Sequence, residues 1–146
     1  MLDHEGIARL IPHSGRMCLL ARLQAWDDSA IRCLATSHTD ADNPLRSASG
    51  LLVSAAIEYA AQAAALHGAL IAQAAGGSAT PGYLASARSV QCHRLRLDDL
   101  PGALQIDATR QAGDARQLLY AFSVSHAGQV VVAGRLAVVL NTPLPA

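Results

Sequence analysis

The sequence has no excess of charge of either sign. Eleven Lys and Arg residues balance eleven Asp and Glu residues over 146 positions, so the formal net charge at pH 7 is zero. Proteins that bind nucleic acid or an anionic membrane surface usually carry an excess or a large patch of positive charge. We therefore expect no nucleic-acid partner and no membrane partner.

The sequence also lacks a secretory signal and a disulfide or metal-binding pattern. Its first residues, MLDHEGIARLIPHSG, do not combine a basic start with a following apolar run. Cys18, Cys33 and Cys92 are odd in number and are not spaced as C-x-x-C or as another metal-binding motif. We expect a cytoplasmic protein with reduced, buried thiols, and we predict no metal ion or other cofactor.

Hydrophobic residues, in contrast, make up 51% of the chain, which is ample for the core of a single domain spanning residues 1–146. They are densest in LLVSAAIEYAAQAAALHGALIAQAA, from Leu51 to Ala75. A helix that is apolar nearly all round is a buried helix, and Gly76-Gly77 can take the left-handed conformation that ends one. A membrane span is the alternative, but Glu58 and the abundance of alanine disfavour it.

Alternation of polar and apolar residues predicts strands on both sides of this helix. In the second strand, for example, Ile31, Cys33 and Ala35 share one face, whereas Arg32, Thr36 and His38 lie largely on the other. After a short helix within residues 3–10, the expected strands are Met17–Trp26, Ala30–His38, Tyr83–Leu97, a strand containing Leu104, Ile106 and Ala108, and the hairpin Gln117–Ser125 with Gln129–Leu140.

This order predicts an α+β domain in which one antiparallel sheet wraps a single long helix, because no other element is large and apolar enough to cover the sheet. That arrangement is the hotdog fold. Hotdog protomers usually pair through their edge strands, which also removes an exposed edge. We therefore expect a dimer, and the sequence leaves open whether it is a homodimer or a heterodimer.

The best candidate for acid–base chemistry is Glu58, because burial in an apolar helix would raise the pKa of its carboxyl group toward the useful range. Its alternative role is structural, as the partner of an arginine or a buried donor. Gln62 follows one turn later and could orient Glu58 or a substrate carbonyl, or face the surface. Backbone N–H groups at the helix start, from Gly50 through Val53 to Ser54, could bind an oxyanion.

Three segments carry a family resemblance: IPHSGRMCLL, then NPL, then IEYAAQAAALHG. Between about Ile7 and Leu70 the chain resembles the 3-hydroxyacyl-acyl carrier protein dehydratases of the FabZ and FabA group. It is most similar to their ApeP-like branch, which is associated with aryl-polyene and xanthomonadin pigments. The resemblance implies elimination of water from a 3-hydroxyacyl thioester on acyl carrier protein, with Glu58 as the acid acting on the departing hydroxyl.

The sequence departs from that family at the general base. The dehydratases use a histidine in a His-Phe-Pro-Gly loop, where this chain has Asn43-Pro44-Leu45, and a neutral asparagine cannot accept the proton. His13 is the preferred replacement, because it lies in the best-matched segment, and His38 is the second candidate. His67 is about half a turn out of phase with Glu58 and should face elsewhere.

Two other activities remain open from the sequence. A helix carboxylate can also activate water, as a hotdog acyl thioesterase would require, and the missing loop histidine is consistent with a non-catalytic or weakly active subunit of a heterodimeric dehydratase. An acidic carrier protein would need a basic docking surface. Arg88, Arg94 and Arg96 share strand parity and could form it, or could belong to an ordinary solvated face.

Overall fold

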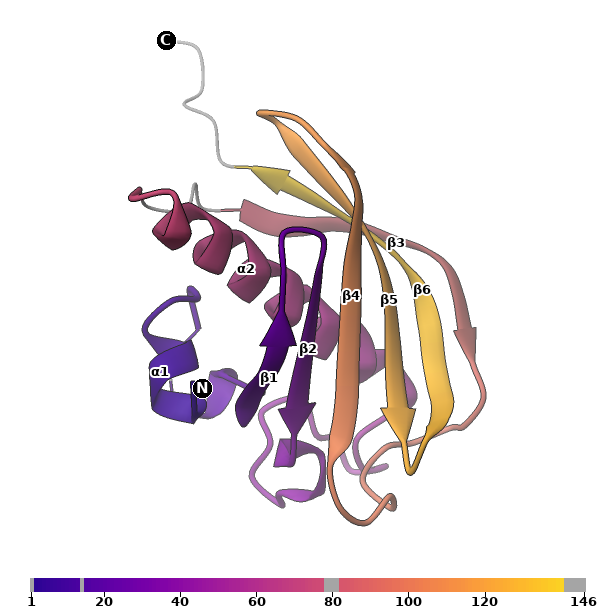
Figure 1. Cartoon of the computed structure of the whole chain (residues 1–146). Helices are drawn as coiled ribbons and strands as arrows, with labels where there is room; N and C mark the ends of the chain where they lie inside the picture. The colour runs from indigo at the N-terminus through magenta and orange to yellow at the C-terminus, as the bar shows by residue number, and fades with distance from the viewer. Residues whose placement is uncertain (1, 14, 78–81, 141–146) are drawn as a thin grey trace, which may run out of the picture.

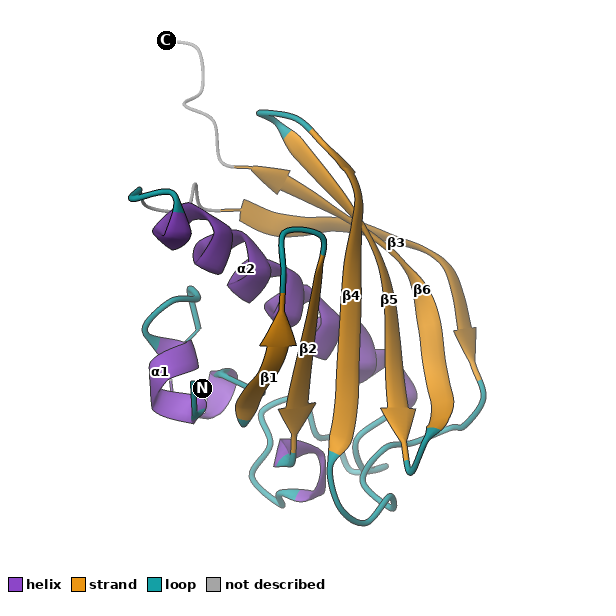
Figure 2. Ribbon diagram, in the orientation of Figure 1, coloured by secondary structure: helices purple, strands orange, loops and turns teal. Residues whose placement is uncertain are grey.

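The computed structural model describes residues 2–13, 15–77 and 82–140. Two α-helices, six strands and three short 3-10 helices follow one another along these residues (Figures 1 and 2). In order they are α1 His4–Ala8, η1 Gly15–Met17, β1 Arg22–Trp26, β2 Ala30–Ala35, η2 Ser37–Thr39, η3 Val53–Ala55, α2 Ala56–Ala74, β3 Gly82–Cys92, β4 Leu104–Gly113, β5 Gln117–His126 and β6 Gln129–Leu140.

The six strands form one antiparallel sheet in the order β1-β2-β4-β5-β6-β3, and this sheet curves around α2 (Figure 1). The inward rows are apolar and buried, and include Ile31, Cys33, Ala35, Leu104, Ile106, Ala108, Phe122, Val124, Val132 and Leu136. The side chains of α2 that face these rows complete the core. The predicted hotdog fold is therefore confirmed.

Helix α2 is buried on one side only. Tyr59, Leu66 and other residues that face the sheet are fully buried, whereas Glu58, Ala61 and Ala65 are half-buried. The expectation that the whole helix is enclosed is thus wrong for part of its circumference. The sheet of one chain covers a single face, because it wraps the helix without closing around it.

The helix also begins later than Leu51, where the sequence predicts its start. Leu52 is extended and forms a β-bridge with Arg96, and the Leu51 carbonyl accepts from the Leu97 N–H at 2.8 Å. Gly50, with φ of +92°, turns the chain into this bridge, a conformation that glycine adopts without strain. Long-range pairing therefore replaces what would have been the first helical turn.

Three strands are shorter than predicted because tertiary contacts end them. Strand β1 starts at Arg22 because residues before it form η1 and a buried coil. Strand β2 stops at Ala35, and His38 is then buried in η2, where its Nε2 contacts the Leu100 carbonyl at 2.9 Å. Strand β3 ends at Cys92, after a bulge that includes Ser89 with φ of +52°.

Several local predictions are confirmed. The β5–β6 hairpin turns at Ala127 and Gly128, both with positive φ, as a type I′ turn requires. Gly76, with φ of +81°, ends α2.

The cysteines agree with the prediction only in part. Cys18 and Cys33 are buried and free, but Cys92 is exposed, contrary to expectation. The predicted tail from 142 to 146, and residues 78–81 of the linker, lie outside the described residues.

Within the described residues, none of the helices is long and apolar enough to cross a membrane.

Candidate active site

Glu58 lies in the first turn of α2, on its half-buried side. Within residues 2–13, 15–77 and 82–140, neither an ion pair nor a hydrogen bond engages its carboxylate. The alternative of a structural pairing with an arginine therefore finds no support among these residues. The carboxylate is left available to a ligand.

Gln62, one turn after Glu58, has a structural role that the sequence did not predict. Its side chain is 1% exposed, its Oε1 accepts from the Leu19 N–H at 2.8 Å, and its Nε2 donates to the Met17 carbonyl at 2.7 Å. The amide satisfies two backbone groups of the segment before β1, which no strand partner reaches. Gln62 therefore does not face the surface, and its amide fixes this segment on α2.

The segment that Gln62 holds continues the chain from His13. On the other side of His13, Ile11 and Pro12 border a pocket together with Ala64 and Gly68 of α2. His13 therefore lies in a segment that runs alongside α2, about one to three turns beyond Glu58. It is half-buried, and its Nδ1 is shielded from solvent without a hydrogen-bond partner among the described residues.

Asn43 stands where the resemblance places the family's histidine, and its amide is committed to the fold. Its Nδ2 donates to the Ser37 carbonyl at 2.9 Å and to the Tyr59 hydroxyl at 3.1 Å, and its Oδ1 accepts from the Leu45 N–H at 2.8 Å. Asn43 is 5% exposed. It anchors the loop to α2 through Tyr59, so the base must come from elsewhere.

The backbone N–H groups at the start of α2 are mostly used within the chain. Gly50 donates to the Ser47 carbonyl, Leu51 to Asp98 Oδ1 and Val53 to the Leu95 carbonyl. The expectation that Gly50 and Val53 bind an oxyanion is therefore wrong for their N–H groups. Ser54 is exposed, and no hydrogen bond within the described residues engages its N–H, which leaves this N–H free at the helix end.

The family profile described as ApeP-like, ApeP dehydratase, matches residues 5–144. The chain belongs to the ApeP-like dehydratase family. The match extends through every strand, well beyond the segment in which the sequence motifs resemble the dehydratases. No curated protein matches the chain.

Solved structures similar to this ApeP-like protein share its fold. The dehydratase heterocomplex ApeI:P from Xenorhabdus doucetiae superposes with a TM-score of 0.85 at 24% identity, over 97% of this chain and 93% of the other. A thioesterase from Haemophilus influenzae gives a TM-score of 0.61 at 14% identity, over 99% and 94%. A hypothetical thioesterase with coenzyme A from Streptococcus pneumoniae gives 0.59 at 11%, over 85% and 88%.

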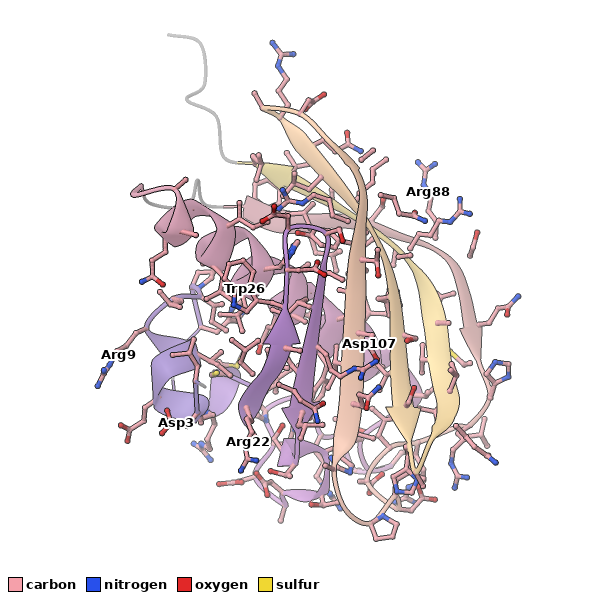
Figure 3. All side chains as sticks on the ribbon, viewed as in Figure 1. Asp3, Arg9, Arg22, Trp26, Arg88 and Asp107 are labelled. Carbon is pink, nitrogen blue, oxygen red and sulfur yellow. The ribbon has the colours of Figure 1, made fainter. Side chains whose placement is uncertain are left out.

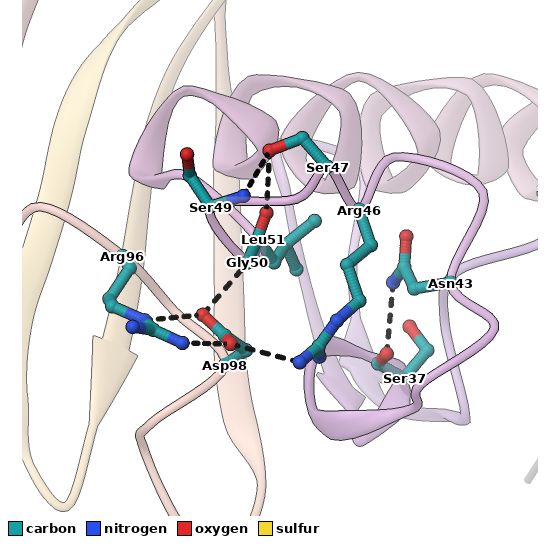
Figure 4. Close-up of polar contacts among 9 residues, drawn as sticks. All are labelled: Ser37, Asn43, Arg46, Ser47, Ser49, Gly50, Leu51, Arg96 and Asp98. Carbon is teal, nitrogen blue, oxygen red and sulfur yellow. Dashed lines mark hydrogen bonds and ion pairs between the residues drawn. The ribbon is translucent and has the colours of Figure 1, made fainter.

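An ionic cluster around Asp98 fixes the loops that lead into α2 of this ApeP-like protein (Figure 4). The carboxylate is 2% exposed, binds the Arg96 guanidinium through two hydrogen bonds and lies 3.4 Å from Arg46. It also accepts the Leu51 N–H at 3.1 Å. The Arg96 hydrogen bonds hold the pKa of Asp98 well below its usual range. This cluster could not be predicted from local sequence patterns, because its members are up to about fifty residues apart.

The predicted basic docking surface is weakened by the same contacts. Arg96 pairs with Asp98, and Arg94 lies 3.7 Å from Asp99. Arg88 alone of the three lies on β3, opposite Arg135 of β6, and projects from the sheet edge (Figure 3). The three arginines therefore do not form one uncompensated face.

His38 and His67 of this ApeP-like protein are fully buried, and burial lowers the pKa of each imidazole below its ordinary value of 6.5. His67 accepts from the Tyr120 hydroxyl at 2.7 Å and donates to the Asp27 carbonyl at 2.8 Å, so it is a neutral core residue as expected. His38 Nδ1 has no hydrogen-bond partner among the described residues, but 0% exposure keeps it from solvent.

These two histidines predict a loss of stability in mild acid. Just below pH 6.5 these histidines bind more protons in the unfolded chain than in the folded one. Their contribution to the free energy of unfolding is therefore complete above pH 6.5 and is lost as the pH falls. We expect the melting temperature to decrease from about pH 7.5 to about pH 5. The low pKa of Asp98 matters only below 3.8, outside this window. His38→Gln should flatten the profile, and a constant melting temperature would contradict the prediction.

Proposed function

We propose that this protein eliminates water from 3-hydroxyacyl groups carried as thioesters on acyl carrier protein, in fatty-acid-like or aryl-polyene pigment biosynthesis. The observation that carries the proposal is the uncommitted carboxylate of Glu58 at the start of α2. A half-buried carboxylate without a partner is unfavourable for folding alone, and such groups are concentrated at functional sites. Family membership supports the dehydratase class.

In the proposed reaction, His13 removes the proton on the carbon next to the thioester carbonyl. Its ring is suited to this role because none of the hydrogen bonds among the described residues engages it. The electron pair of the broken C–H bond forms the new double bond, and the C–O bond to the hydroxyl breaks. Glu58 donates a proton to this hydroxyl, which leaves as water.

Negative charge builds on the thioester oxygen while the proton is removed. The N–H of Ser54 is the proposed donor to this oxygen, since the neighbouring N–H groups of Leu51 and Val53 are used within the chain. It lies at the positive end of the α2 dipole, which favours the developing anion.

A second candidate function is that of a subunit that completes or stabilises another hotdog dehydratase. Asn43, in the place of the family's loop histidine, is bound to Ser37 and Tyr59 and supplies no base. The similar structure from Xenorhabdus doucetiae is a dehydratase heterocomplex. In this version, Glu58 works with a base from a different hotdog chain, and the half-buried side of α2 meets that chain.

Mass measurement of the product tests these functions. The purified chain is incubated with a 3-hydroxyacyl carrier-protein thioester, and the acyl-protein mass is followed. We expect loss of one water from an intact thioester. Release of free acid would instead indicate the thioesterase reaction. An unchanged mass for the chain alone, followed by dehydration once a second hotdog protein is added, would establish the subunit role.

A further inference from the structure

A mainly apolar pocket of about 460 Å³ lies against the C-terminal half of α2. Its walls come from α2, from residues 9–12 and from the strand ends of the sheet, and include Leu10, Ile11, Ala65, Ile71, Leu118 and Val138. Pockets that bind small molecules fall in this range, roughly 300–1,000 Å³, and combine apolar walls with a few placed polar groups. The placed polar group here is Arg110.

Arg110 enters the pocket from the inner face of the sheet. It continues the inward row of Leu104, Ile106 and Ala108 on β4, and it is half-buried. Among the described residues, none of the carboxylates lies within 4.0 Å of its guanidinium. The positive charge of Arg110 therefore has no negative partner within the described residues. It favours binding of a ligand that supplies a hydrogen-bond acceptor.

The guanidinium is held in place by a buried network. Its Nε and Nη2 donate to the Tyr120 hydroxyl at 3.1 and 2.9 Å, and that hydroxyl donates to His67. Tyr120 and His67 are both 0% exposed. The network fixes where Arg110 points but neutralises none of its charge, because neither of these residues is anionic.

Two other charged residues border the pocket, and both are directed elsewhere. Asp114 accepts the N–H groups of Arg116 and Gln117 at 2.7 and 2.9 Å, which holds its carboxylate in the β4–β5 turn. Arg9 is exposed and projects away from the domain (Figure 3). Arg110 is thus the charge that meets the interior of the pocket.

The pocket and Glu58 lie along the same face of α2. Glu58, Ala61, Ala65, Gly68 and Ala72 recur at helical spacing, and all five are half-buried. From Glu58 to Gly68 the helix rises by about 15 Å. An extended group that starts at Glu58 can follow this low wall of small side chains and end beside Arg110, whose Nη2 is 3.9 Å from where a Gly68 Cβ would stand.

We propose that Arg110 recognises the far end of the acyl group, and that the favoured acyl chain is elongated, apolar and terminated by an oxygen acceptor such as a hydroxyl. The proposal rests on the proposed function in that the ligand is the acyl thioester whose reacting end meets Glu58. Apolar walls accept the body of the chain, and the guanidinium donates hydrogen bonds to its terminal oxygen.

The test is calorimetric binding of two acyl-pantetheine amides of equal, long chain length, one ending in methyl and the other in hydroxyl. Neither carries a 3-hydroxyl group, so no dehydration takes place. We expect the hydroxyl-terminated probe to bind the protein roughly tenfold more tightly, since one hydrogen bond to a charged donor is gained. Arg110→Met should abolish the preference, and Arg110→Lys should retain part of it.

Gly68→Leu provides a second, independent variant. Position 68 has room for a Cβ, and the added side chain extends into the pocket. This variant should weaken both long probes and leave an acetyl-pantetheine amide unaffected. Equal binding of the two long probes by the unmodified protein, or a preference that survives Arg110→Met, would overturn the proposal. Because these measurements require no turnover, they separate it from a failure of the dehydratase function.

Discussion

Replacing Glu58 with glutamine should reduce dehydration roughly 10²- to 10⁴-fold, the usual contribution of a positioned acid or base. Glutamine preserves the size of the side chain and its place in the first turn of α2 but cannot donate the proton that turns the hydroxyl into water. Since the Glu58 carboxylate has no partner among the described residues, its loss should leave the melting temperature nearly unchanged. The rate is measured from the mass shift of the acyl carrier protein.

A matched control is available because the chain has one other glutamate, the exposed Glu5 of α1. Glu5→Gln should retain the full rate, and equal rates for Glu58→Gln and Glu5→Gln would exclude Glu58 as the acid. His13→Gln in the same assay assigns the base. If Glu58→Gln is inactive and His13→Gln is fully active, the proton is removed by another residue, and the two-chain version of the reaction is favoured.

Replacing Gln62 with methionine should lower the free energy of unfolding by about 1–3 kcal/mol, because it leaves the buried Leu19 N–H without an acceptor and removes the donor to the part-buried Met17 carbonyl. These two groups contact the glutamine amide at 2.8 and 2.7 Å. Methionine fills a similar volume, so the change reports hydrogen bonding and not a cavity. Denaturant unfolding provides the measurement.

Gln73→Met serves as the control, since Gln73 lies on the same helix with an exposed side chain. We expect it to change stability by no more than about 0.5 kcal/mol. Gln62→Met should also slow dehydration, because the segment it releases continues from His13. Equal stability of the two variants would show that the Met17–Leu19 segment does not depend on α2.

Local pattern determined the fold. The alternation of Ile31, Cys33 and Ala35 on one strand sets which face is buried, and the apolar stretch around Glu58 provides the one element able to cover the sheet. The turn at Ala127-Gly128 is defined by the positive φ angles of these two residues, which are local to the turn. These features depend on neighbours in the sequence, so they could be predicted without coordinates. The inward position of Arg110 follows from the same alternation and could have been found.

Tertiary structure decided what each polar residue of the site does. Gln62 was predicted on a helix face near Glu58, but only the fold shows that its amide forms hydrogen bonds with backbone groups more than forty residues away. Asn43 and Asp98 are likewise defined by distant partners, Tyr59 and Leu51. Whether Glu58 is free depends on every side chain packed around it. Sequence fixes which face a residue takes, because that follows from helix and strand geometry, whereas hydrogen-bond partners depend on how the separate elements pack together.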